Sequence, residues 1–119
     1  MVAGTLLPAA LLVGTAGCGG RPVLSTDPDR ARSVLEGVLG DWRDGATPSD
    51  LRQRSPAVHV ADERWLAGER IERFTIGVGE AFGTAVRIPA ELTFAVGKKP
   101  LRVWYVVTTE PALSVVLAD

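Results

Sequence analysis

The sequence contains very little of the residue types that usually build disulfides, metal sites or catalytic triads. Its 119 residues include a single cysteine and a single histidine. One cysteine cannot form a disulfide within the chain, and a zinc site needs three or four ligands of mainly cysteine and histidine type. We therefore predict no disulfide and no metal site, and we expect the domain to be stabilised by its hydrophobic core.

Charge is absent from one part of the chain. Residues 1–20 carry no Lys, Arg, Asp or Glu, so all 13 basic and 14 acidic side chains lie between Arg21 and Asp119. The net charge of −1, with acids and bases interleaved, gives no field that would attract nucleic acid. We therefore predict no nucleic-acid binding, and we divide the chain into an uncharged N-terminal segment and one domain of about a hundred residues.

A long apolar run is absent as well. The stretch Leu6–Ala16 has 11 residues, whereas a membrane-spanning helix needs about 20. Its length matches the apolar region of a secretory signal, which has about 7–15 residues and is followed by small ones. The small residues here are Thr15, Ala16 and Gly17, and Cys18 comes next.

The segment TAGC, residues 15–18, resembles the lipobox of bacterial lipoproteins. The resemblance implies that residues 1–17 are a signal peptide and that the Cys18 thiol receives a diacylglycerol before cleavage. Two or three acyl chains, at about 0.8 kcal/mol per buried methylene, give stable membrane anchoring. Gly19, where lipoproteins kept in the inner membrane often have Asp, favours the outer membrane by the same resemblance. A cytosolic protein with an apolar N-terminal arm and a secreted protein cleaved elsewhere are the alternatives.

Residues 18–26 are predicted to be a tether. They include Gly19, Gly20 and Pro22, which favour a solvated connection. Such a tether spans up to roughly 30 Å when extended. We expect residues 27–119 to form a single domain that stands clear of the bilayer, on the periplasmic or extracellular side.

Two helices are predicted at the start of this domain. Asp27 is a good N-cap before Pro28, and Gly45 is a natural stop. Between them, apolar residues recur at helical spacing: Ala31, Val34, Leu35, Val38, Leu39 and Trp42. A second, short helix should begin at the cap Thr47, with Asp50 completing a capping box, and end before Pro56.

From Ala57 onward the apolar period changes to two, which is typical of strands. A single helical turn from Asp62 to Gly68 should interrupt this pattern and turn Trp65 and Leu66 inward. The segments GEAFG, GKKP and TEPA read as turns between successive strands, and short connections favour antiparallel pairing. Pro89 should lie at an edge or a bulge. We therefore predict an α+β fold in which the two helices pack on a curved antiparallel sheet of four to five strands.

This order of elements resembles the cystatin-like and NTF2-like folds, in which a curved sheet wraps around a helix. The resemblance extends over roughly residues 27–118 and rests on the pattern alone. It implies a cone that encloses either a packed core or a ligand cavity.

The motifs for catalysis are weak. His59 has Asp62 and Glu63 close by, but no nucleophile motif such as GxSxG accompanies it, so a partly exposed strand histidine is the preferred interpretation. Gly77, Gly79 and Gly83 do not fit the GxGxxG spacing and precede a strand, so we interpret them as hairpin glycines. We predict no cofactor.

Three hypotheses follow for function. The preferred one is a lipid-anchored binding or interaction domain without catalytic activity. The alternative is a small enzyme or ligand carrier whose NTF2-like cavity is lined by Trp65, Trp104 and His59. The third is a structural envelope protein that packs against itself. Trp104, Val106 and Val116 make the second face of the sheet partly apolar, and a protein partner, a second copy or the Trp65 segment could cover it.

Overall fold

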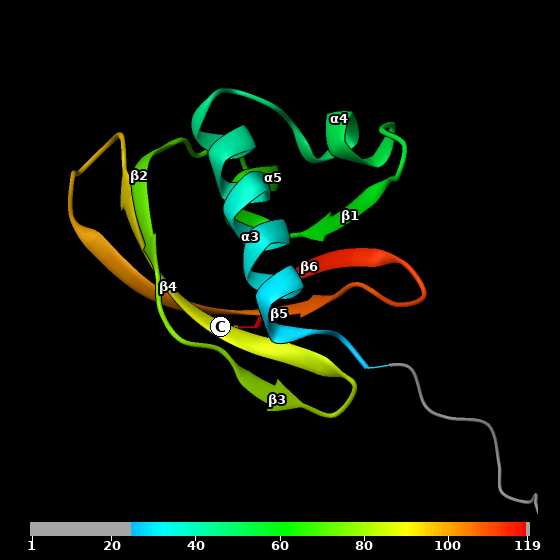
Figure 1. Ribbon diagram of the computed structural model, residues 1–119. Helices are drawn as coiled ribbons and strands as arrows, with labels where there is room; N and C mark the ends of the chain where they lie inside the picture. Colours follow the sequence, from blue (N-terminus) through cyan, green and yellow to red (C-terminus); the bar gives the residue numbers. More distant parts are fainter. Residues whose placement is uncertain (1–24, 119) are drawn as a thin grey trace, which may run out of the picture.

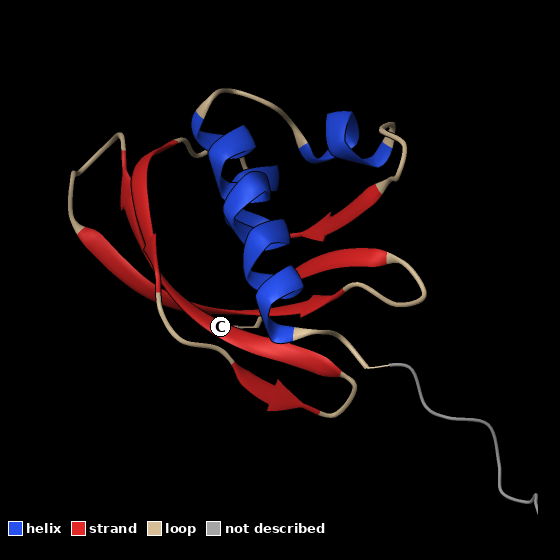
Figure 2. Ribbon diagram, viewed as in Figure 1, coloured by secondary structure: helices blue, strands red, loops and turns tan. Residues whose placement is uncertain are grey.

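Helix α3 (Pro28–Arg43) lies in the hollow of a curled six-stranded sheet (Figure 1). The structure is a computed structural model that describes residues 25–118. The predicted signal peptide, the lipidation site Cys18 and most of the predicted tether lie outside the described residues. The helices of the described part of the chain lie on the concave side of the sheet, as Figure 2 shows.

Helix α3 begins and ends where the sequence predicts. The Asp27 carboxylate accepts a hydrogen bond from the backbone N–H of Arg30 at 2.9 Å, which caps the first turn. After the helix, Gly45 takes a φ of +102°, a left-handed conformation that favours glycine. The predicted apolar stripe faces the sheet, and its buried members are Ala31, Leu35, Val38, Leu39 and Trp42.

Two shorter helices follow. In α4 (Pro48–Arg52), Thr47 and Asp50 form the predicted capping box, and these hydrogen bonds hold the pKa of Asp50 below its ordinary value. The one-turn helix α5 (Glu63–Leu66) is capped by Asp62. Trp65 is buried as predicted, but Leu66 is 67% exposed, so its predicted inward position is wrong. Adjacent helical residues point about 100° apart, and one turn against this core buries only one of them.

Six strands make up the sheet, in the order β1-β6-β5-β4-β2, with β3 also paired to β4. Their bounds are β1 Val58–Ala61, β2 Ile71–Ile76, β3 Glu80–Phe82, β4 Ala85–Phe94, β5 Pro100–Thr108 and β6 Leu113–Leu117. The predicted α+β class is confirmed, and the alternating apolar positions of β4, β5 and β6 face the helix.

The prediction that the sheet is purely antiparallel is wrong. Strand β1 pairs parallel with β6, with Val58 opposite Leu113 and Val60 opposite Val115. A parallel pair needs a crossover connection, and here the whole of α5 and β2–β5 lies between the two strands. The prediction from short turns covered only neighbouring strands, so it missed this long-range contact.

Near Gly77 and Pro89 the structure also differs from the sequence-based prediction. The predicted turn GEAFG is in part a strand, β3, and the connection between β2 and β3 runs close to β4. Pro89 lies within the central strand β4 rather than at an edge or bulge, at the point where β4 changes partner from β2 to β3. Its missing N–H therefore interrupts no ladder, and its carbonyl accepts a hydrogen bond from Gly77 N–H at 2.8 Å.

Gly77 and Gly79 serve close approach rather than a hairpin turn. A Cβ atom on Gly77 would lie 2.8 Å from Cγ of Pro89, and one on Gly79 would lie 2.8 Å from Cγ1 of Val86. Of these three glycines, Gly83, with a φ of +63°, is the one in a turn conformation that favours glycine. The predicted hairpin role is therefore correct for one of the three glycines.

Candidate functional site

The concave side of the sheet is filled by side chains. Trp42, Leu35 and Leu39 of α3 pack against Tyr105 and Leu92 of the sheet, and each of them is at most 1% exposed. The interior therefore has the character of a packed core, in which side chains interdigitate with few voids.

A buried carboxylate lies at one end of this core. Asp62, 2% exposed, follows β1 and caps α5, and its Oδ1 accepts hydrogen bonds from the backbone N–H groups of Arg64 at 3.0 Å and Trp65 at 3.3 Å. Its Oδ2 accepts a hydrogen bond from the Tyr105 hydroxyl at 2.7 Å. The sequence predicts the cap from the position of Asp62. It does not reveal the tyrosine, whose partner lies four strands away along the chain.

The chemistry of this pair is that of a structural contact. Burial, and then the negative charge and hydrogen bond of Asp62, raise the pKa of Tyr105 far above its ordinary value. The hydroxyl therefore stays protonated and acts as a donor. Within residues 25–118, no buried side-chain nitrogen or oxygen is left without a hydrogen-bond partner, so the interior presents no free polar group to a substrate.

Trp65 belongs to this core rather than to a pocket. Its ring stacks on Trp42, with centroids 5.0 Å apart and planes 8° apart. The indole N–H of Trp65 donates to the Ala46 carbonyl at 2.9 Å, and that of Trp42 donates to the Glu69 carbonyl at 2.8 Å. The two rings therefore tie the loops after α3 and α5 to the core, which confirms the core role predicted for Trp42. Because Trp65 packs on the concave side, it cannot cover the outer face of the sheet.

Trp104 lies on that outer face, opposite Pro89 of the neighbouring strand. The Arg87 guanidinium lies 4.1 Å from the centroid of its ring, and that of Arg102 lies 5.9 Å away. Arg87 also bonds to Glu80 at 3.4 Å. Arg102 makes no ion pair within the described part of the chain. The outer face thus presents an aromatic ring beside a cation that has no ion-pair partner among residues 25–118.

A groove of about 430 Å³ runs beside Trp104. It is lined by Glu63, Arg64, Leu101, Arg102, Val103, Trp104 and Leu117. The groove lies beside the part of β5, from Pro100 to Trp104, that precedes the pairing of Tyr105 with Leu117 of β6.

The main chain of β5 is open in this groove. The Ala118 N–H donates to the Trp104 carbonyl at 2.8 Å, so the Trp104 backbone faces β6. On a strand, the N–H and C=O groups of residues two positions apart point to the same side. Those of Arg102 therefore point to the same side as those of Trp104. No strand of residues 25–118 pairs with β5 there. An open strand edge is a template for a further strand.

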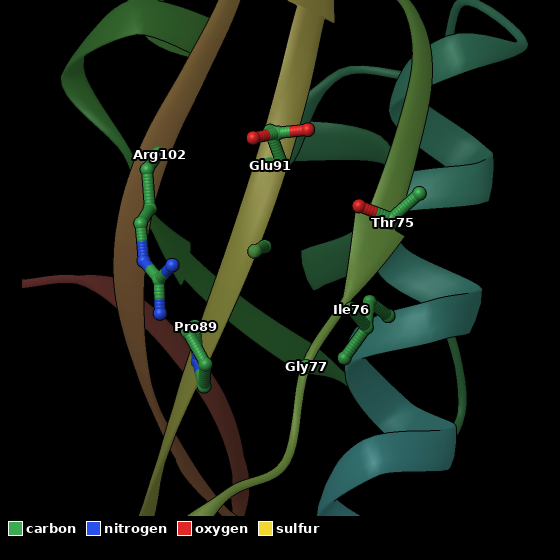
Figure 3. A pocket seen from close by; sticks show the side chains of 7 residues that line it. Thr75, Ile76, Gly77, Pro89, Glu91 and Arg102 are labelled. Carbon is green, nitrogen blue, oxygen red and sulfur yellow. The ribbon is translucent and has the colours of Figure 1, made fainter.

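A smaller hollow of about 180 Å³ lies on the other side of Arg102. Figure 3 shows Arg102 extending along the sheet towards Pro89, with Glu91 on the strand between Arg102 and Thr75. Arg102 thus lines both depressions.

The structure separates the three residues predicted to line a cavity. His59 is exposed on β1, where it lies opposite Ser114, on the same face of the sheet as Trp104. They are two strand spacings and four residue positions apart, because His59 lies opposite Ser114 and Ser114 opposite Thr108, which corresponds to roughly 16 Å by strand geometry. Trp65 lies on the opposite side of the sheet, and neither Trp65 nor His59 lines the two depressions beside Arg102.

Within residues 25–118, His, Cys, Asp and Glu side chains form no group of three or more suited to a metal ion. The described helices include none with the length and apolarity required to cross a membrane. Comparison of the chain with models of protein families, with curated proteins and with solved structures gave no match.

Proposed function

We propose that this chain is a lipid-anchored binding domain of the cell envelope, without catalytic activity, that engages a protein partner through the outer face of its sheet. The anchor rests on the resemblance of residues 15–18 to a lipobox. The packed interior, in which the polar groups satisfy one another, supports binding on the outside rather than catalysis or ligand carriage within.

The observation that carries the binding surface is the combination at Arg102. Its backbone lies on an open strand edge, its guanidinium has no ion-pair partner among the described residues, and it flanks the exposed part of Trp104. An extended peptide fits this arrangement, because main-chain hydrogen bonds along a strand edge give affinity and adjacent side-chain contacts give specificity. An acidic side chain of that peptide would pair with the guanidinium, and an apolar one would pack on Trp104.

Crosslinking in the native envelope tests the surface. A photoreactive residue placed at Arg102 of the full chain should give a discrete adduct with another protein, and Trp104→Ala should abolish it. The matched control is the same residue at Val96, which is 91% exposed in the β4–β5 turn. An adduct of twice the chain's own mass would identify a second copy as the partner. Equal labelling from both positions would contradict the proposed surface.

Mass analysis of protein from its native membrane tests the anchor. We expect a chain that begins at Cys18 and carries acyl chains, and we expect Cys18→Ala to leave the membrane fraction. Membrane retention of that variant after washing with high salt would contradict lipid anchoring.

A further inference from the structure

The described chain enters the domain at one fixed point. Thr26 is only 6% exposed, its N–H donates to the Thr84 carbonyl at 2.8 Å, and its hydroxyl oxygen accepts from the Thr109 N–H at 3.0 Å. Thr84 lies in the turn between β3 and β4, and Thr109 follows β5. In Figure 1, the start of α3 accordingly lies beside the tip of the β3–β4 hairpin.

This same hairpin exposes one large apolar side chain, and a second is exposed on the connection that leads into it. Phe82, two residues before Thr84, is 54% exposed, and Val78, on the connection that leads into β3, is 87% exposed. Within the hairpin, Arg87 bonds to Glu80 at 3.4 Å. Phe82 is therefore the large apolar side chain exposed at the end of the domain that holds Thr26, where Asp27, Asp29 and Glu110 are exposed as well.

We propose that Phe82 and Val78 contact the lipid bilayer and orient the domain on it. The inference rests on the proposed lipid anchor at Cys18, which lies eight residues before Thr26. Eight residues reach at most about 29 Å, so the anchor keeps the hairpin near the bilayer at a high effective concentration. At this effective concentration the hairpin contacts the bilayer even if the contact alone is too weak to bind an unanchored protein to the membrane. Aromatic and aliphatic side chains bury well at the membrane interface. The domain thus touches the bilayer at this end, in place of the clear stand-off expected from the tether.

The opposite end of the sheet provides a matched control. Val96 is 91% exposed, but it follows the far end of β4, whereas Phe82 pairs with Ala85 at the near end. A strand of ten residues spans roughly 33 Å. In the proposed orientation, with the near end on the bilayer, Val96 therefore lies away from it.

Site-specific fluorescence tests the contact. With Cys18 lipidated, Phe82→Cys and Val96→Cys each provide the one free thiol of the full chain, which is labelled with an environment-sensitive dye. In vesicles of phosphatidylethanolamine and phosphatidylglycerol, the label at position 82 should shift to the blue and be quenched severalfold more by nitroxide-labelled lipids than the label at position 96. The difference should persist in high salt, because the contact is apolar.

The outcomes separate this inference from the proposed function. A labelled chain that stays on the vesicles with equal quenching at positions 82 and 96 overturns the bilayer contact and leaves the anchor intact. A chain that carries no acyl groups, or that leaves the vesicles, overturns both. As a second variant, the dye on Val78→Cys should be quenched as strongly as the dye on Phe82→Cys. Adding Phe82→Glu to the Val78→Cys chain should weaken the quenching at position 78. An unchanged signal would contradict the role of Phe82.

Discussion

Replacing Tyr105 with phenylalanine removes the hydroxyl that, among the described residues, is the sole donor to Oδ2 of the buried Asp62. The hydrogen bond lost is 2.7 Å long, and the two backbone donors that remain both bond Oδ1. A hydrogen bond to a charged group contributes about 1.5–3 kcal/mol, and we expect Tyr105→Phe to lower the free energy of unfolding by that amount. Chemical denaturation measures it by linear extrapolation. Thr75→Val, which removes an exposed hydroxyl from β2, is the control and should change stability by less than about 0.5 kcal/mol.

A double-mutant cycle assigns the effect to the pair. Asp62→Ala alone removes the cap of α5, at a cost of about 0.5–2 kcal/mol, and also leaves the Tyr105 hydroxyl without its acceptor. Once either partner is gone, the second change should cost less, with a coupling energy of about 0.5–3 kcal/mol. Costs that add to within about 0.5 kcal/mol would refute the reasoning.

The same pair predicts a dependence on alkaline pH. Burial, followed by the charge of Asp62, raises the pKa of Tyr105 in the folded protein above its value in the unfolded chain. The resulting stabilisation is fully present below the unfolded pKa of about 10 and is lost as the pH rises above it, by up to about 1.4 kcal/mol per pH unit. Since the chain has one tyrosine, phenolate absorbance reports on it directly. It should appear only when the protein unfolds, and gradual ionisation of the folded protein near pH 10 would count against the burial of the hydroxyl.

Three further substitutions test local features of the fold. Gly77→Ala should lower stability by about 1–3 kcal/mol, because its Cβ would lie 2.8 Å from the Pro89 ring. Gly37→Ala in α3 should raise stability by about 0.5–1 kcal/mol, since nothing lies within 4 Å of its added Cβ; thermal unfolding of both variants checks the opposite signs. Asp27→Ala removes the hydrogen bond to Arg30 N–H and should cost about 1 kcal/mol, with faster hydrogen exchange confined to the first turn of α3 if the loss is local.

The elements of this fold that the sequence predicts correctly are those defined by short-range patterns. The helix from Pro28 follows from a cap, a proline and an apolar stripe within 16 residues. The pairing of β1 with β6 has no such local signal, because it depends on where the chain returns after four intervening strands. The exposed position of Leu66 depends in the same way on which residue of one turn meets the core.

The candidate surface could be predicted in part. Opposite parity on β5 places Trp104 and Tyr105 on different faces, and the structure confirms this. The edge beside Arg102 is open because β6 pairs with β5 only from Tyr105 onward, and the apolar pattern does not reveal how far two strands overlap. The hydrogen bond between Asp62 and Tyr105 joins residues 43 positions apart. It cannot be predicted without the arrangement of the whole sheet, which brings the two residues together.

The aromatic residues argue for a surface rather than an interior function. A cone that carries a ligand needs open volume between helix and sheet, lined by a few convergent polar groups. Here Trp42 and Trp65 stack in that place, and their N–H groups are bonded to main-chain carbonyls of the adjoining loops. Removing the stack to admit a ligand would break two hydrogen bonds as well as the packing. Trp104, by contrast, lies on the other face of the sheet, beside the Arg102 guanidinium and a strand edge that no other element of residues 25–118 pairs with, where a partner can reach it without disturbing the core.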